Sequence, residues 1–266
     1  MNKLMIAGCL ACILTWSPVW AVKVKALYEV EMSVASQAAD ARAEAIREGF
    51  QEVLIKLTGD QDVAKNKLIK SSLDKADYFV QEYSYSSPTV SSATYNLRVK
   101  YNEPDVKRLL RKAGAKHWGE KRPLVLVWLA TINDRHEVDI LGVETANDVL
   151  ENFKRQGQRY GLPLIFPVMD VTDMEKITSD NITSLAMPEL RDASKRYGPD
   201  VLLVGTIEQD DGGYRGKWNL IWNDKSWDWV VSGDTQEKLI AEVLDNVSQI
   251  LSRRRNVQNN AELSQN

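Results

Sequence analysis

Four tryptophans near the end of the chain are the residues whose type and spacing best suit a binding function. They alternate along two predicted strands joined by a turn at 223–226, and they are Trp218, Trp222, Trp227 and Trp229. Aromatic rings on one face of a hairpin can stack on sugar rings or receive the apolar side chains of a partner protein. The simpler interpretation is that they pack beneath the helix that follows. In either case we expect Trp222 and Trp227, nearest the turn, to be the ones that reach solvent.

No arrangement of residues predicts catalysis, metal binding or a cofactor. The two histidines, His117 and His136, are far apart and lie in predicted connections, whereas a zinc hydrolase needs histidines at helical spacing and a carboxylate. The sequence has no G-x-S-x-G elbow, and the segment 213–217 lacks the spacing of a phosphate loop. Three acidic pairs lack the pattern of a calcium loop, and we interpret them as loop and capping residues: Asp60/Asp62, Asp170/Asp173 and Asp210/Asp211. We therefore expect a protein that is not an enzyme.

Residues 1–21 have the pattern of a secretory signal peptide. A short basic start at Lys3 precedes the apolar run 4–14, and Val19-Trp20-Ala21 supplies a cleavage site. The run is shorter than the about 20 apolar residues that a membrane-spanning helix needs. We therefore expect cleavage after Ala21 and a periplasmic protein with no transmembrane segment in its mature chain.

Both cysteines, Cys9 and Cys12, lie in the predicted signal peptide, so the predicted mature chain has neither a thiol nor a disulfide. One alternative remains open, because Ile6-Ala7-Gly8-Cys9 resembles the lipobox after which a bacterial lipoprotein is cleaved and acylated. The protein would then be an outer-membrane lipoprotein that associates with the membrane through Cys9. Against this alternative, few residues precede Cys9 and the apolar run continues to Leu14.

The charge balance argues against nucleic acid as a partner. The sequence has 34 Lys and Arg residues against 37 Asp and Glu residues, whereas phosphate neutralisation needs a concentrated positive field. The one dense basic run, Arg253–Arg255, follows a predicted helix, where cations complement the helix dipole.

Residues 22–119 predict a small β-α-β-β-α domain of the α+β class. Strict alternation of apolar and polar residues at 94–101 indicates a strand with one face on a core and the other in water. The expected elements are a strand at 22–32, a helix from about Ser36 to Gly59, short helices within 62–76, a hairpin of strands at 78–85 and 94–101 that is broken at 86–88, and a helix from Asn102 to Gly114. The polar segment 116–122 is the predicted linker.

Residues 120–255 predict a mixed-sheet α/β domain with a carboxy-terminal antiparallel meander and a closing helix. Continuous apolar runs at 124–129 and 201–207 are typical of strands buried on both faces. The remaining expected elements are a helix from Val149 to Gly161, a short strand at 163–167, a helix at 188–197, the meander strands at 214–222 and 227–231, and a helix that starts at Asp234 with Glu237 in a capping box. We expect the polar tail 256–266 to fray.

The segment Ala193–Ile207 places a helix, a Tyr-Gly turn, an aspartate and a buried strand in succession. In this it resembles the α/β domain of envelope assembly proteins, including the amino-terminal domain of the Tol-system translocation protein, the curli secretion lipoprotein and the middle domain of the flagellar H-ring protein. The first block is similar to the amino-terminal domain of that flagellar protein. Over its predicted mature length the chain resembles an uncharacterised family of secreted proteobacterial proteins, known only as a domain of unknown function. The resemblance implies binding and assembly, and no catalytic residue.

These observations favour a non-enzymatic binding or assembly protein of the periplasm, such as a peripheral subunit of a secretion system or another envelope-spanning machine. Its partners would be envelope proteins that contact sheet edges and the tryptophan hairpin. The alternative is a protein that binds cell-wall glycan through the same tryptophans. A hydrolase acting on glycan or lipid is the third hypothesis.

Overall fold

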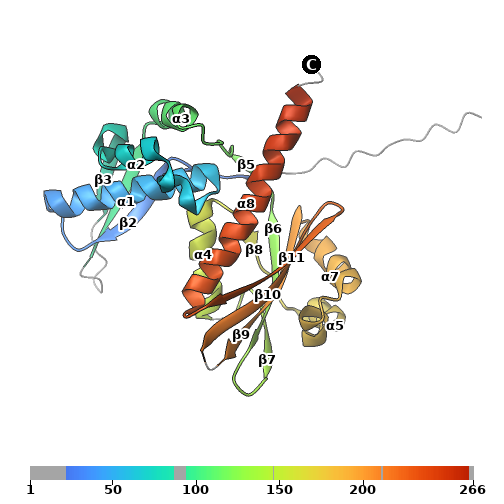
Figure 1. Ribbon diagram of the computed structural model, residues 1–266. Helices are drawn as coiled ribbons and strands as arrows, with labels where there is room; N and C mark the ends of the chain where they lie inside the picture. Colours follow the sequence, from blue (N-terminus) through green and yellow to red (C-terminus); the bar gives the residue numbers. More distant parts are fainter. Residues whose placement is uncertain (1–21, 87–93, 146, 211, 264–266) are drawn as a thin grey trace, which may run out of the picture.

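The computed structural model describes residues 22–86, 94–145, 147–210 and 212–263, which form two blocks that differ in architecture (Figure 1). The predicted signal peptide with Cys9 and Cys12, the predicted break at Ser87 and Pro88, and the last residues of the tail lie outside the described residues. Within the described ranges, none of the helices combines the length and the apolar character needed to cross a bilayer.

The first block is a three-stranded antiparallel sheet with helices on one face, as predicted. The strand order is β2-β4-β3, and α1 packs on the apolar face of this sheet. The Phe50 ring of α1 stacks on the Tyr101 ring, with the two centroids 5.1 Å apart. The elements are β2 (Glu29–Val34), α1 (Ala39–Thr58), α2 (Lys67–Leu73), β3 (Val80–Ser86), β4 (Tyr95–Tyr101) and α3 (Glu103–Lys112). Gly59 ends α1 in the left-handed conformation, with φ of 70°.

The expected single strand at 22–32 is wrong, because the chain breaks into two short strands. Ala26 adopts a positive φ of 58°, which turns the chain between β1 (Val22–Lys23) and β2. β1 then pairs with β5 (Lys121–Arg122) instead of continuing along β4. The start of the described chain is thus fastened to the segment that joins the two blocks.

The second block is built on a mixed six-stranded sheet, which confirms the predicted α/β class with a meander and a closing helix. The order is β11-β10-β9-β6-β7, and β8 also pairs with β6. β6, β8 and β9 are parallel, whereas β9, β10 and β11 form the antiparallel meander. The bounds are β6 (Val125–Ile132), β7 (Val138–Leu141), β8 (Leu164–Ile165), β9 (Val201–Asp210), β10 (Gly213–Trp222) and β11 (Lys225–Gly233).

Helices cover both faces of this sheet, which explains why β6 and β9 are apolar throughout. One face packs against α4 (Asp148–Tyr160) and α8 (Gln236–Leu263), and the other packs against α6 (Ser179–Thr183) and α7 (Met187–Ser194), with α5 (Val171–Lys176) beside α7. Figure 1 shows α8 crossing one side of the sheet and α5 and α7 on the other. The segment 170–184 contains the two short helices α5 and α6.

The closing helix differs from the prediction at both ends. At its start, the Thr235 hydroxyl accepts a hydrogen bond from the Lys238 amide at 3.3 Å, so Thr235 caps the helix instead of Asp234. Asp234 forms an ion pair with Lys238 at 2.9 Å. At the other end the helical backbone continues to Leu263, so most of the tail expected to fray is helical.

One apolar core runs through both blocks, and the predicted linker is buried where it joins them. Arg122 has no exposed surface and donates hydrogen bonds to the carbonyl oxygens of Lys56 at 2.8 Å, Trp118 at 3.1 Å, Gly119 at 2.7 Å and Tyr160 at 3.2 Å. Its guanidinium also lies over the Trp118 ring, 3.6 Å from the centroid. Because Lys56 belongs to α1 and Tyr160 to α4, one side chain ties the two blocks together.

Candidate functional site

The structure buries two of the four candidate tryptophans beneath α8 and α4. Trp218 is 1% exposed and Trp222 is 7% exposed, whereas Trp227 and Trp229 are partly buried against the same core. The expectation that Trp222 reaches solvent is therefore wrong. The packing interpretation is confirmed for Trp218 and Trp222, and only Trp227 and Trp229 remain available for a contact with a partner or a glycan.

The candidate residues for metal or catalytic chemistry do not lie together. His136 is exposed, whereas His117 is partly buried beside the Tyr28 hydroxyl at 3.1 Å, and burial lowers the pKa of the His117 imidazole. Across the described ranges, no three His, Cys, Asp or Glu side chains gather in a way that could hold a metal ion.

A polar hollow of about 500 Å³ lies at the carboxyl ends of β6 and β9, where open α/β sheets commonly bind ligands. Two of its amide side chains are engaged locally. Asn133 donates to Glu137 at 2.6 Å, and Asn147 accepts from the Val149 amide at 2.7 Å as the cap of α4. The hollow therefore indicates no particular ligand.

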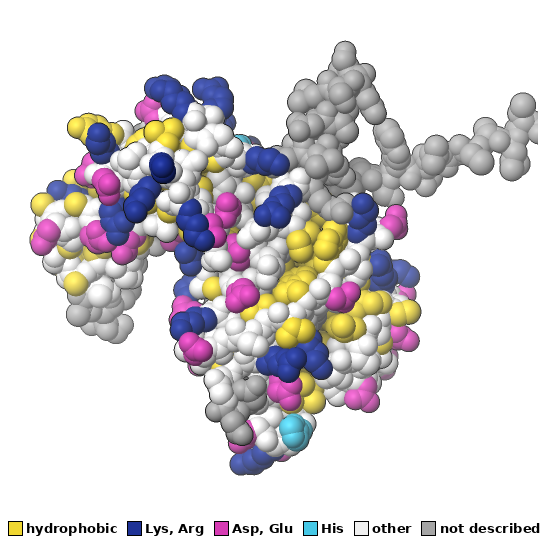
Figure 2. All heavy atoms as spheres, in the orientation of Figure 1, with side chains coloured by type: hydrophobic (Ala, Val, Ile, Leu, Met, Phe, Trp, Pro, Cys, Tyr) yellow, Lys and Arg dark blue, Asp and Glu magenta, His cyan; other side chains and the backbone are white. Residues whose placement is uncertain are grey.

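A different surface stands out, on the face of the sheet away from α8. Val168 is 41% exposed, Val171 is 70% exposed and Met174 is 61% exposed. Val171 and Met174 lie three residues apart on α5, where side chains at this spacing are neighbours, and Val168 lies just before the cap residue Asp170; we call these three residues the α5 surface. Figure 2 shows hydrophobic side chains emerging over this part of the molecule among charged ones. Single exposed apolar residues are ordinary, but a contiguous set indicates a contact site.

The backbone that presents the α5 surface is held in an unusual conformation. Met169 has a positive φ of 59°, which is uncommon for a residue with a side chain. Asp170 caps α5 by accepting a hydrogen bond from the Asp173 amide, and Ile177 anchors the far end in the core at 2% exposure. Such local strain persists only where surrounding contacts impose it.

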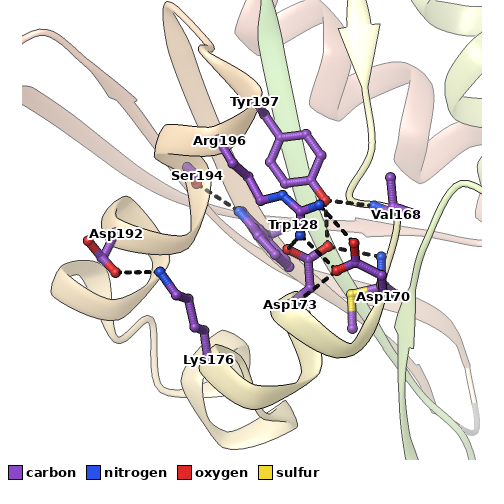
Figure 3. Close-up of polar contacts among 10 residues, drawn as sticks. Trp128, Val168, Asp170, Asp173, Lys176, Asp192, Ser194, Arg196 and Tyr197 are labelled. Atoms are coloured by element: carbon purple, nitrogen blue, oxygen red, sulfur yellow. Dashed lines mark hydrogen bonds and ion pairs between the residues drawn. The ribbon is translucent and has the colours of Figure 1, made fainter.

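Those contacts come from a polar cluster beneath α5 (Figure 3). Arg196 forms a two-bond ion pair with Asp170, both distances being 2.7 Å, and reaches the Asp173 carboxylate at 3.1 Å. The Tyr197 hydroxyl donates to Asp173 at 2.5 Å and accepts from the Val168 amide at 2.9 Å. The Asp173 side chain is 1% exposed, so its polar atoms are satisfied by these partners instead of by solvent.

Asp170 and Asp173 are one of the acidic pairs found in the sequence, but the sequence did not predict their contacts with Arg196 and Tyr197. Capping is confirmed for Asp170, whereas the interpretation of Asp173 as an ordinary loop or capping residue is wrong, because its carboxylate is buried. Its partners Arg196 and Tyr197 lie more than twenty positions away, just after α7. No periodic pattern relates the two segments, so the contacts of Asp173 with Arg196 and Tyr197 could not be predicted from the sequence.

The first block is similar in sequence to a known family of domains. Residues 21–119 match the model of one protein family. That family is described as Domain of unknown function (DUF8605). The DUF8605 match spans the three-stranded block and ends at Gly119, just before the buried Arg122.

Outside the DUF8605 match the comparisons add little. No curated protein matches the sequence significantly. Among solved structures, a formyltetrahydrofolate deformylase from Pseudomonas putida KT2440 aligns over 72% of this chain and 88% of its own, with 9% identity and a TM-score of 0.19. At that TM-score the alignment carries no argument about fold or function.

The ion pair between Arg196 and Asp170 lies outside the DUF8605 region. It predicts that the stability of the protein decreases at acid pH. The hydrogen bonds from Arg196 hold the pKa of the Asp170 carboxyl at about 2, below its ordinary value of 3.8. The pair therefore stabilises the fold fully above pH 3.8, and this contribution is lost as the pH falls through about 2. Titration of the Asp170 carboxyl carbon by NMR should give an apparent pKa near 2. In an Arg196→Gln variant it should rise towards 3.8, and an ordinary value in the unaltered protein would contradict the ion pair.

Proposed function

We propose that this protein is a non-enzymatic binding or assembly protein of the periplasm that docks onto an envelope protein through the α5 surface. Such a protein would serve as a peripheral subunit of an envelope-spanning machine, for example a secretion system. The observation that supports the proposal is the exposure of Val168, Val171 and Met174 on a backbone held by the buried Asp173 carboxylate.

Rigid presentation matters because binding costs less when the contact surface is already ordered. Apolar residues at the centre of a contact supply most of its energy, and a few side chains suffice. Charged residues lie close to the α5 surface, including the pair between Lys176 and Asp192 at 2.9 Å. An apolar centre with a polar rim is the usual anatomy of a protein–protein interface.

Glycan binding by the tryptophan hairpin is the second candidate. It is supported by the partial exposure of Trp227 and Trp229, two residues apart on the edge strand β11. It is weakened by the burial of Trp218 and Trp222, which leaves a platform of two rings instead of four. Fluorescence quenching by soluble glycan fragments, abolished in a Trp227→Ala/Trp229→Ala variant, would favour this candidate over docking at α5.

The docking proposal is tested by placing a photo-reactive amino acid at Val171 or Met174 in cells and identifying the attached protein. Leu68 is the matched control, because it is an apolar residue at 41% exposure on α2 of the other block. We expect one protein to be attached from α5 and not from Leu68. The affinity of the purified pair should then fall about tenfold or more in a Val171→Asp/Met174→Asp variant and stay unchanged in Leu68→Asp. Equal capture from all three positions, or equal affinity in both variants, would contradict the proposal.

A further inference from the structure

A groove separates the two blocks on the side of β2, away from the α5 surface. It contains two hollows of about 550 and 370 Å³ that share Glu52. In both, β2 and α1 form one wall, while α4 or the residues just after it form the other. The outline of the molecule is concave between the blocks on this side (Figure 2).

The outer edge of β2 runs along this groove, because β2 is an edge strand of the three-stranded sheet. The Tyr101 amide donates to the Tyr28 carbonyl at 2.8 Å, which makes this a hydrogen-bonded pair of the antiparallel register. Such pairs alternate along a ladder, so the main-chain groups of Glu29, Glu31 and Ser33 point away from β4. An edge of this kind can accept a further strand.

One end of the edge is already closed by the protein itself. The Glu29 amide donates to the Ala26 carbonyl at 3.1 Å, and the Glu29 carbonyl accepts from the Lys56 ammonium at 3.0 Å. Lys56 is 9% exposed, and burial lowers the pKa of its ammonium. Within the described residues, no hydrogen bond takes up the outward main-chain groups of Glu31 and Ser33. The open part of the edge therefore begins beyond Lys56.

The opposite wall offers a polar group without a partner. Gln156 on α4 is 7% exposed and lines the groove, and its buried Oε1 accepts no hydrogen bond from the described residues. A buried acceptor left unpaired costs about 1–3 kcal/mol, so a donor supplied from outside would be favourable. A peptide N–H is such a donor.

The charges of the groove restrict what can occupy it. Glu48 and Glu52 lie on the α1 wall, and Arg155 and Arg159 lie on the α4 wall. The presence of both signs suits neither a polyanion nor a polycation. Apolar side chains also line the groove, among them Leu162 and Pro163. This combination suits a peptide main chain with apolar side chains at alternate positions.

We propose that the groove binds an extended peptide segment of a partner protein, which pairs with the outer edge of β2 as a fourth strand. Glu31 and Ser33 exchange main-chain hydrogen bonds with the peptide, and Gln156 accepts a hydrogen bond from it. Alternate apolar side chains of the peptide face Leu162 and Pro163. This site is separate from the α5 surface, so either one can operate without the other.

The test begins with peptides selected on the purified protein from a random-peptide library displayed on phage. We expect the selected peptides to alternate apolar and polar residues and to contain no proline at their centre. With a selected peptide bound, hydrogen exchange measured by NMR should slow about tenfold or more at the amides of Glu31 and Ser33. The amides of Val30 and Met32, which already face β4, should change little. Failure to enrich any peptide, or protection centred on another strand, would overturn the proposal.

Three variants separate peptide pairing from a general loss of structure. Glu31→Pro removes an outward amide that β4 does not use, and it should abolish peptide binding. Gln156→Met removes the unpaired acceptor at similar volume, and it should weaken binding without lowering thermal stability, which keeps the test informative if the proline variant fails to fold. The Val171→Asp/Met174→Asp variant should bind the peptide normally. Full binding by a folded Glu31→Pro protein would refute pairing along β2.

Discussion

Replacing Arg122 with alanine is expected to lower the free energy of unfolding by about 3–5 kcal/mol. Losses of this size are usual when one partner of a buried charged interaction is removed. The guanidinium is fully buried and donates to four carbonyl oxygens in α1, the joining segment and α4. Without it, the carbonyl groups of Lys56 and Tyr160 each lose a buried donor, and each such loss costs about 1–3 kcal/mol. The measurement is urea unfolding followed by circular dichroism.

Two further variants make the Arg122 result specific. Lys121→Ala changes the exposed neighbour on the same short strand and should alter stability by less than about 0.5 kcal/mol. Arg122→Lys keeps the charge but lacks the planar fork that serves several acceptors, so an intermediate loss is expected. If Arg122→Ala lost less than about 1 kcal/mol, the apolar core alone would hold the blocks together.

Replacing Gly205 with alanine is expected to destabilise the protein by about 1–3 kcal/mol or more through overpacking. A Cβ at this position would lie 2.6 Å from Cδ2 and Cζ3 of Trp218 and closer still to Cε3. The Trp218 ring cannot move aside easily, because it is 1% exposed and packs on the Phe153 ring at 5.7 Å. The expected loss is read from thermal or urea unfolding.

A double-mutant cycle tests the cause of the Gly205 effect. Trp218→Ala alone should cost about 3–5 kcal/mol, because it removes a large buried ring. In that background the added cost of Gly205→Ala should fall below about 1 kcal/mol, since the clash is gone. Gly119→Ala is the control, because no atom beyond the adjacent residues lies within 4 Å of a Cβ placed there. An equal cost of Gly205→Ala in both backgrounds would mean that strain arises elsewhere.

The sequence predicted the classes of both blocks because their signals are local and periodic. Strict alternation at 94–101 and the apolar run at 201–207 correspond to β4 and β9. The break at Ala26 escaped prediction because alternation of side chains does not register a single positive φ. The burial of Trp222 also escaped prediction because it depends on tertiary contacts. A ring next to a turn becomes buried only when another element, here α8, extends over it.

The surfaces proposed for binding were harder to predict than the fold. Val168, Val171 and Met174 lie in a segment that showed no clear periodicity, and their exposure results from the distant partners Arg196 and Tyr197. The groove along β2 needs residues of both blocks, including Gln156 and Glu52, and no local pattern relates them. Such sites become visible only when segments far apart in the sequence are placed in space.

The contacts of α8 with the first block have a consequence for the order in which the chain can fold. Ser248 donates to the Gly59 carbonyl at 3.1 Å, and the Gln61 amide donates to Asp245 at 3.4 Å. A polypeptide is made from its amino terminus, so α1 and the turn after it exist well before α8. This flank of the first block therefore stays uncovered until α8, 189 residues further along the chain at Ser248, has been synthesised.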